Sequence, residues 1–370
     1  MALINLTGFD HFKTAPFSVT NSQILINTLS NLSCGLSAGP GSTMEALPVY
    51  QNIQYSGYLG IAEVSLSSGK VRKFLTNWNQ NGYVRHYYPA TYLNSLPKVG
   101  KWVIGCRVYY NAGPSAGSPA ILLNMRLGAT AVPAVTAPAP GVYYVETEID
   151  WANLTVKTWL NGVLQNTYSG SAYVNATYTS SYIYIGAYTS YNLTSFVNGY
   201  TDLYFGVEEN TTEAGTLSRF GPILVKPQPW VSAENMDLFV PAVKSTPLEQ
   251  FNSNNVDLGN NAVDYNYSAN TVKSSAHGEI GVLTAGAPTE TLPIVAVTLS
   301  ALSHKLSQAA AGTTLQVKQG SAQTTADKTV PGLQGSPTRK TFGFLKALDG
   351  SAWSSEKVGQ IKLNLGSYRP

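Results

Sequence analysis

The 370-residue sequence predicts an all-β protein whose first domain is a β-sandwich, and three observations support this prediction. Apolar and acidic residues alternate with a period of two between Tyr143 and Trp151, as in a strand that buries one face. Asn161-Gly162 supplies the two positive-φ residues of a type I′ hairpin turn. Short apolar runs separated by turn residues recur along the chain, without a convincing amphipathic helix. Because a half-apolar sheet needs a second sheet to cover it, we expect a sandwich.

The stretch Tyr143–Tyr168 is expected to form three consecutive antiparallel strands at the centre of this sandwich. One set of side chains in its first strand should face the core: Val145, Thr147, Ile149 and Trp151. The alternating set should form a solvated acidic face: Glu146, Glu148 and Asp150. A second hairpin is expected where Lys70–Trp78 and Tyr83–Tyr88 flank Asn79–Gly82.

The composition of the chain divides it into two parts. Four prolines lie between Ile223 and Pro247, and the sequence beyond them is poor in tyrosine and becomes rich in Ala, Thr, Ser and Gln. We therefore expect a first domain over residues 1–227, a linker over 228–247 and a small β-domain over 248–370. The run Leu292–Leu306 fits either a strand or a helix by spacing, and the interleaved Thr298 and Ser300 favour a strand.

Charge and cysteine content limit the partners. Charged residues make up 12% of the chain, and the net charge is +3, so neither nucleic acid nor an anionic membrane is expected as a partner. No apolar run reaches the length of a membrane span, and no basic and apolar leader opens the sequence. Cys34 and Cys106 are expected to be buried reduced thiols, although they could pair if the fold brought them together.

Two segments resemble known families. The run WANLTVKTWLNGVL, Trp151–Leu164, resembles the central hairpin of concanavalin A-like, laminin G-like jelly rolls. The run PIVAVTLSALSHKL, Pro293–Leu306, and the closing segment Phe344–Ser354 with its acidic turn and Trp353 resemble a module of bacteriophage virion structural proteins. The resemblance implies a concanavalin A-like jelly-roll sandwich followed by a smaller β-sandwich domain.

The same resemblance implies a function. It points to a non-catalytic structural component of a tailed-phage virion, in the tail, a fibre or a head or collar decoration, with a contribution to host attachment. The implied partners are other virion proteins, further copies in a homo-oligomer and a host surface glycan, without a cofactor, nucleic acid or membrane insertion. Such a protein would be assembled in the host cytoplasm and reside in the virion.

A polysaccharide-degrading enzyme is the alternative. Family 16 glycoside hydrolases, also concanavalin A-like, carry E-x-D-x-x-E or E-x-D-x-E on one strand, and Glu148 and Asp150 match the first half. The second glutamate would fall at Ala152 or Asn153, and Glu146 lies on the wrong side of the motif. The sequence therefore favours a non-enzyme.

Tyrosines supply the candidate binding residues. Seven lie between Tyr178 and Tyr204, and Tyr182 and Tyr184 alternate with two isoleucines, so that the two sets face opposite ways. Glycan contact, a subunit interface and ordinary strand packing stay open as interpretations. The residues proposed for contact are Tyr182, Tyr184, Tyr188, Tyr191 and Tyr200.

Metal and nucleophile signals are weak. The four histidines, His11, His86, His277 and His304, are scattered. Four residues could gather oxygen ligands for Ca²⁺, but a charged turn is the simpler interpretation: Asp202, Glu208, Glu209 and Asn210. No G-x-S-x-G, P-loop or dinucleotide-binding fingerprint occurs, so the sequence gives no support for nucleophilic catalysis or nucleotide binding.

Overall fold

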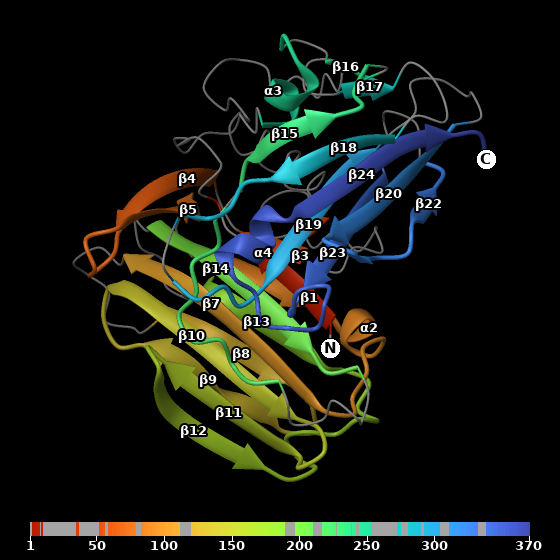
Figure 1. Cartoon of the computed structure of the whole chain (residues 1–370). Helices are drawn as coiled ribbons and strands as arrows, with labels where there is room; N and C mark the ends of the chain where they lie inside the picture. Colours follow the sequence, from red (N-terminus) through yellow and green to blue (C-terminus); the bar gives the residue numbers. More distant parts are fainter. Residues whose placement is uncertain are drawn as a thin grey trace. The chain divides into compact units, whose positions relative to one another are not determined.

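The computed structural model describes most of the chain (Figure 1). The described residues are 2–7, 9, 35–36, 52–55, 58–78, 83–111, 120–188, 197–209, 217–226, 228–237, 239–241, 244–252, 272–274, 280–289, 292–303, 311–331 and 338–370. They divide into two compact units, Met1–Lys226 and Pro227–Pro370. Strands dominate both units, which confirms the predicted all-β class.

The first unit is a sandwich of two sheets (Figure 1). Sheet A runs in the order β12 (Val163–Ser169), β11 (Thr155–Leu160), β10 (Gly141–Asp150), β7 (Lys101–Asn111), β14 (Val197–Val207), β5 (Val71–Trp78) and β4 (Tyr58–Ser65), with β1 (Ala2–Thr7) also paired to β14. Sheet B runs β2 (Gly35–Leu36), β3 (Asn52–Tyr55), β6 (Tyr83–Tyr88), β13 (Tyr182–Tyr188), β8 (Ala120–Arg126) and β9 (Ala131–Ala137). All pairs are antiparallel except β2 with β3.

Aromatic side chains fill the space between the two sheets. Trp102 of β7 is fully buried and packs edge-on against Trp151, with ring centroids 4.7 Å apart. Phe205 of β14 meets Tyr88 of β6 across the sandwich at 5.0 Å. Each such ring removes enough apolar area from water to contribute roughly 1.5–3 kcal/mol to folding. Sheet A therefore presents alternate residues to this core, and the others face away from sheet B.

The central stretch forms the predicted strands. Val145, Thr147 and Ile149 are fully buried, as their alternation indicates. Asn161 and Gly162 have φ of 51° and 82°, as a type I′ turn between β11 and β12 requires. These two predictions are confirmed because alternation and turn chemistry are local properties of the sequence.

The predicted second hairpin is wrong. β5 pairs with β4 and β14 in sheet A, whereas β6 pairs with β3 and β13 in sheet B. Because the two strands belong to different sheets and both contribute buried residues, they lie in opposite layers of the sandwich. The residues expected as the turn lie outside the described ranges, and a local turn signal does not distinguish a hairpin from a passage between layers.

The second unit has its own sheet and core. Its sheet runs β15 (Trp230–Glu234), β18 (Ile280–Ala285), β24 (Ile361–Tyr368), β20 (Gly312–Gln319) and β21 (Ala322–Gln323), with β22 (Asp327–Thr329) paired to β20. Two strand pairs, β16 (Phe239–Pro241) with β17 (Val272–Ser274) and β19 (Val297–Ser303) with β23 (Thr338–Phe344), and helices α3 (Pro247–Asn252) and α4 (Ser355–Gly359) complete it. Leu283, Val317 and Trp353 lie in its core. The strand expected within Leu292–Leu306 is confirmed as β19, whereas β15 places part of the expected linker in this sheet.

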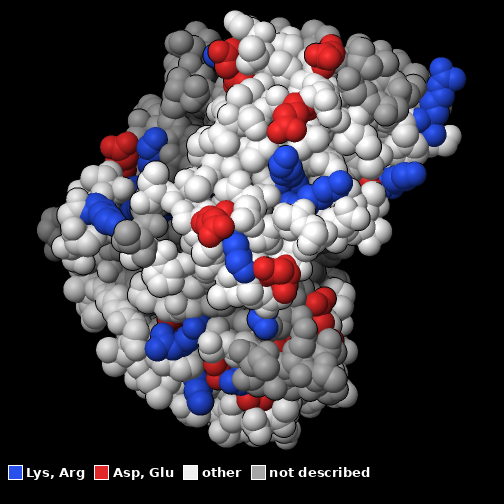
Figure 2. Space-filling model, in the orientation of Figure 1, with Lys and Arg blue, Asp and Glu red and all other residues white. Residues whose placement is uncertain are grey.

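Charged side chains are dispersed in this chain. Figure 2 shows acidic and basic residues interspersed on the visible face, without a single-sign patch.

Among the described residues, no helix has the length and hydropathy that crossing a membrane requires. One short helix, α2 (Ala90–Leu93), precedes β7 in the first unit.

Candidate functional site

A segment without strand pairing crosses the face of sheet A that points away from sheet B. We call this segment, residues 217–226, the strap. Three buried carboxylates accept hydrogen bonds from its backbone: Glu146 of β10, Asp202 of β14 and Glu208, which directly follows β14. Glu208 accepts from Leu217 N–H at 2.6 Å, Glu146 from Gly221 N–H at 2.8 Å and Asp202 from Val225 N–H at 2.9 Å. The carboxylates thus supply acceptors that a neighbouring strand would otherwise provide.

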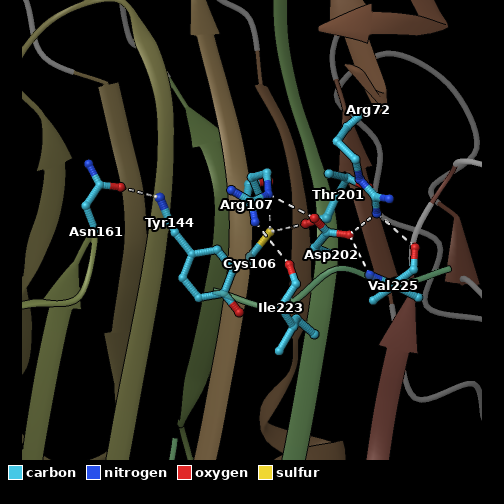
Figure 3. A network of polar contacts seen from close by, with 9 residues as sticks. All are labelled: Arg72, Cys106, Arg107, Tyr144, Asn161, Thr201, Asp202, Ile223 and Val225. Carbon is cyan, nitrogen blue, oxygen red and sulfur yellow. Dashed lines mark hydrogen bonds and ion pairs between the residues drawn. The ribbon is translucent and has the colours of Figure 1, made fainter. Parts of the chain in front are cut away.

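Asp202 binds two arginines and the backbone of the strap (Figure 3). It lies in a bulge of β14 with φ of 51°, and its side chain is fully buried. Its Oδ1 accepts a hydrogen bond from Arg72 Nη2 at 2.5 Å, and its Oδ2 accepts one from Arg107 Nε at 2.9 Å. The two guanidinium groups also donate to the strap carbonyls of Val225 and Ile223. Asp202 therefore joins strands β5, β7 and β14 to the strap by charge-assisted hydrogen bonds.

Glu146 is buried in the same way, which corrects the predicted solvated acidic face of β10. Its Oε1 accepts hydrogen bonds from Tyr204 Oη at 2.7 Å and from Gly221 N–H, and its Oε2 accepts one from Arg219 Nη1 at 2.8 Å. Glycine is needed at position 105, because a Cβ there would lie 2.2 Å from the Tyr204 ring. The acidic set alternates as predicted, but the strap covers Glu146.

Glu208 bonds backbone groups in the part of the chain that the structure describes. Its Oε2 accepts a hydrogen bond from Lys101 N–H at 2.7 Å, whereas Asp202 is bound to two arginines. Asn210 lies outside the described residues. Among the residues that the structure describes, no three metal-binding side chains come together. Two of the four residues singled out for Ca²⁺, Asp202 and Glu208, instead accept hydrogen bonds from the strap.

A hollow of about 910 Å³ lies on sheet A beside the strap. It is lined by Ala62, Glu63, Val64, Ser65, Leu66, Ser67, Arg107, Tyr109, Gly141, Val142, Tyr143, Tyr144, Asn161 and Pro222. β4 and β10 both contribute lining residues, although β5, β14 and β7 separate them in the sheet. Sheet A therefore curves around the hollow, and Pro222 of the strap forms part of its wall.

The lining of the hollow includes a guanidinium group, three tyrosines and an amide. Arg107 is held by Asp202 and Ile223, and its Cζ lies 5.3 Å from the Tyr144 ring centroid. Tyr109 is half-buried, and its ring packs edge-on against Phe74 at 6.1 Å. These contacts fix the orientation of both side chains before any ligand enters.

Tyr144 and Asn161 complete this set. Burial, reinforced by Glu146, raises the pKa of Tyr144 well above its ordinary value, so its phenol stays protonated at neutral pH. Asn161 Oδ1 accepts a hydrogen bond from Tyr144 N–H at 2.8 Å, and the residue itself is exposed. Glu63, also exposed, is the one carboxylate among the described lining residues.

The predicted tyrosines fall into three groups. Tyr182, Tyr184 and Tyr188 are half-buried on the face of sheet B that points away from the core. Tyr191 lies outside the described residues. Tyr200 is fully buried in the sandwich, where its hydroxyl lies 3.0 Å from His86 Nδ1, so it does not share a surface with the others.

The carboxylates of the family 16-like motif have structural partners. Glu148 is 12% exposed and lies 3.5 Å from Lys101 Nζ. Asp150 accepts hydrogen bonds from the backbone and side-chain nitrogens of Asn153, both at 2.9 Å, and so closes the turn before β11. Neither lines the hollow.

Sequence reasoning missed most of the residues in the hollow. Arg107 had one available signal, because it interrupts the otherwise uncharged and mostly apolar or aromatic run Trp102–Tyr110 of β7. Asn161 was assigned to a turn only, and nothing local set Tyr109 and Tyr144 apart from the other tyrosines. Cys106, next to Arg107, is buried with a free thiol as expected, and Cys34 lies outside the described residues.

His86 is a core residue whose titration should limit stability in acid. Burial lowers its pKa to about 3, so the folded chain keeps the imidazole neutral while the unfolded chain binds a proton below about pH 6.5. Stability contributed by neutral His86 is therefore present above pH 6.5 and is lost as the pH falls toward 3. As the pH decreases from 6.5 to 3, the free energy of unfolding of the His86→Phe variant should therefore fall less steeply than that of the wild type. The difference between the two slopes should reach up to about 1.4 kcal/mol per pH unit. Denaturant titrations at several pH values measure this, and parallel slopes for the two proteins would contradict it.

Comparisons with known proteins agree on the fold class only. No protein-family model and no curated protein match this sequence. Solved structures with similarity include an alginate lyase from Corynebacterium sp., at 12% identity over 39% of this chain and 80% of that chain, with a TM-score of 0.27. An endo-β-1,4-glucuronan lyase from the fungus Trichoderma reesei matches at 10% identity over 46% and 94%, with a TM-score of 0.31. An alginate lyase of polysaccharide lyase family 7 matches at 11% over 44% and 87%, with a TM-score of 0.29.

These findings correct the function implied by the sequence resemblance. The structures named above are polysaccharide lyases, and none of them is a virion component. The prediction of a non-catalytic tailed-phage structural protein is therefore not upheld, and its alternative, a polysaccharide-degrading enzyme, agrees better with the proteins found. The jelly-roll β-sandwich part of that resemblance is confirmed by the two sheets of the first unit.

Proposed function

We propose that the first unit is a polysaccharide-degrading enzyme that cleaves a carboxylate-bearing polysaccharide by β-elimination in the hollow of sheet A. One observation carries this proposal: the curved sheet gathers Arg107, Tyr109, Tyr144 and Asn161 around the hollow with Glu63 as the one described carboxylate. Its volume of about 910 Å³ falls within the range of roughly 300–1,000 Å³ typical of ligand sites.

Arg107 and Asn161 would bind the sugar carboxylate. The guanidinium uses Nε for Asp202 and Nη2 for the Ile223 carbonyl, and neither contact uses Nη1. A guanidinium and an amide together can neutralise a carboxylate by charge and by hydrogen bonds. That interaction makes the proton on the adjacent carbon more acidic, because it stabilises the charge that develops when the proton leaves.

Tyr109 would transfer the proton. In β-elimination a base removes the proton beside the carboxylate, the C–H electrons form a C=C bond, and the C–O bond to the leaving sugar breaks. The leaving oxygen then takes up a proton, so the reaction balances if the tyrosine begins as the phenolate, accepts the proton from carbon and returns it from the phenol to the leaving oxygen.

The described carboxylates do not favour hydrolysis. Retaining glycosidases need two carboxyl groups about 5–5.5 Å apart, and inverting ones need a pair at about 6.5–9.5 Å. The described lining of the hollow offers only Glu63, while Glu146, Asp202 and Glu208 hold the strap. Elimination requires no carboxylate from the protein.

The test incubates the full chain with uronic acid polymers and with the same polymers after reduction of their carboxyl groups. Alginate and glucuronan come first, because the structures similar in fold are named for acting on them. We expect new reducing ends together with ultraviolet absorbance of the unsaturated uronate, from the acidic polymers alone. Reducing ends without that absorbance would indicate hydrolysis, and no cleavage of any uronate polymer would refute the proposal.

A further inference from the structure

Five tyrosines surround one arginine on the face of sheet B that points away from the core. We call this group the tyrosine platform: Tyr83 and Tyr87 of β6 and Tyr182, Tyr184 and Tyr188 of β13. Tyr184 lies opposite Tyr87 in the antiparallel ladder, and Tyr188 lies opposite Tyr83. All five are half-buried, so they keep ring surface exposed to solvent while packing on one another.

Gly186 makes room for the central arginine. It lies opposite Arg85 with φ of 136°, and a Cβ there would be 2.6 Å from the Arg85 Cα. The Arg85 Cζ lies 3.9 Å from the Tyr184 ring centroid, 4.9 Å from that of Tyr83 and 5.2 Å from that of Tyr188. Cation–π contacts on several rings thus hold the guanidinium in one place.

The rings themselves are fixed. Tyr87 and Tyr184 stack at 4.6 Å with 13° between their planes, and Tyr182 lies 5.2 Å from Tyr184. Tyr83 and Tyr188 are 6.1 Å apart. Because these side chains already have few rotamers available, a ligand that stacks on them loses little of its binding energy to ordering.

Sheet B also has a one-sided charge. Its described strands contain Arg85 and Arg126 and no aspartate or glutamate. Arg126 lies opposite Tyr182 on the same face. Sheet A, in contrast, carries acidic residues on β4, β10 and β14. The platform therefore complements a negatively charged ligand with flat apolar faces, rather than a neutral or cationic one.

We propose that the tyrosine platform is a second, non-catalytic binding site for an acidic polysaccharide. Sugar rings would pack against the ring surface that the platform leaves exposed, and Arg85 and Arg126 would pair with their carboxylates. The ligand class rests on the proposed function, but binding at this site does not require cleavage. The platform lies on the sheet opposite the hollow, so one polymer could contact both faces of the same unit.

The test measures binding of a uronate oligosaccharide, and of a neutral oligosaccharide of equal length, to the full chain. Tyr109→Phe is the starting protein, so that the probe is not cleaved. Adding Tyr184→Ala should weaken uronate binding about tenfold. Adding Arg85→Gln should reduce the preference for uronate over the neutral probe and lower the salt dependence of binding.

Tyr168→Ala is the matched control. Tyr168 is a half-buried tyrosine on β12 of sheet A, in contact with Tyr173 at 5.3 Å and away from the platform. Circular dichroism and thermal melting confirm that each variant is folded. If Tyr184→Ala is not folded, Tyr184→Phe is measured in its place; it keeps the aromatic ring and should keep the affinity for uronate. Calorimetric affinities for Tyr184→Ala and Arg85→Gln that equal those of the starting protein would overturn the proposal.

Two outcomes distinguish polysaccharide binding at the platform from the proposed function and from a contact between copies of the chain. If wild-type protein cleaves no uronate polymer but the platform variants lose affinity, the platform stands and the proposed function falls. If Tyr184→Ala changes the molar mass measured by light scattering while uronate affinity is unchanged, the platform is a contact between copies of the chain. That second result would refute polysaccharide binding at this face.

Discussion

Replacing Asp202 with alanine is expected to lower the free energy of unfolding of the first unit by about 3–5 kcal/mol. The substitution removes the partner of Arg72 and Arg107, whose side chains are 3% and 12% exposed, and leaves two guanidinium groups without their carboxylate. It also removes the acceptor of the Val225 N–H in the strap. Chemical denaturation followed by tryptophan fluorescence measures the change, since Trp78, Trp102, Trp151 and Trp159 belong to the first unit.

Two further variants separate charge from shape. Asp202→Asn keeps the side-chain size and tolerates the left-handed φ of 51°, so any loss of stability reports the missing charge. Glu63→Gln neutralises an exposed carboxylate in the same unit and should change the free energy of unfolding by less than about 1 kcal/mol. If the free energy of unfolding of Asp202→Ala lies within about 1 kcal/mol of the wild-type value, the role assigned to Asp202 is wrong.

Replacing Tyr109 with phenylalanine should reduce kcat on a uronate polymer by about 10²- to 10⁴-fold, the usual effect of losing a general acid–base group. The ring that packs against Phe74 is kept, so the free energy of unfolding should stay unchanged. Initial rates of unsaturated-product formation, at substrate concentrations that define kcat and KM separately, provide the measurement. KM should change little, because carboxylate binding is assigned to Arg107 and Asn161.

The control for this variant removes a phenol hydroxyl elsewhere. Tyr168→Phe lies on edge strand β12, outside the lining of the hollow, and should leave kcat at the wild-type value. If Tyr109→Phe keeps more than about a tenth of wild-type kcat, another group transfers the proton, and the assignment of Tyr109 is wrong.

The sequence predicted what depends on near neighbours. The alternation from Val145 to Ile149 identified a half-buried strand, and Asn161-Gly162 identified its hairpin turn, because side-chain direction and φ preference are local. The same alternation separated Tyr184 from Ile183 and so placed one on the outer face of sheet B and the other in the core.

What the sequence could not supply depends on contacts between distant segments. Nothing local indicated that residues 217–226 would cover Glu146, so a buried carboxylate was predicted to be solvated. The hollow combines β4 with β10 through the curvature of a sheet whose strand order is not sequential. The family resemblance identified the sandwich fold, but it could not identify the function, because one fold hosts many activities.

The strap also decides where the first unit ends. The last strand of its sandwich finishes at Val207, and a boundary placed by strands alone would fall there. A fragment cut at that point would expose the outer face of sheet A and deprive Glu146 and Asp202 of the backbone N–H groups of Gly221 and Val225. The first unit therefore extends through Lys226, and a fragment meant to preserve its sandwich must include the strap.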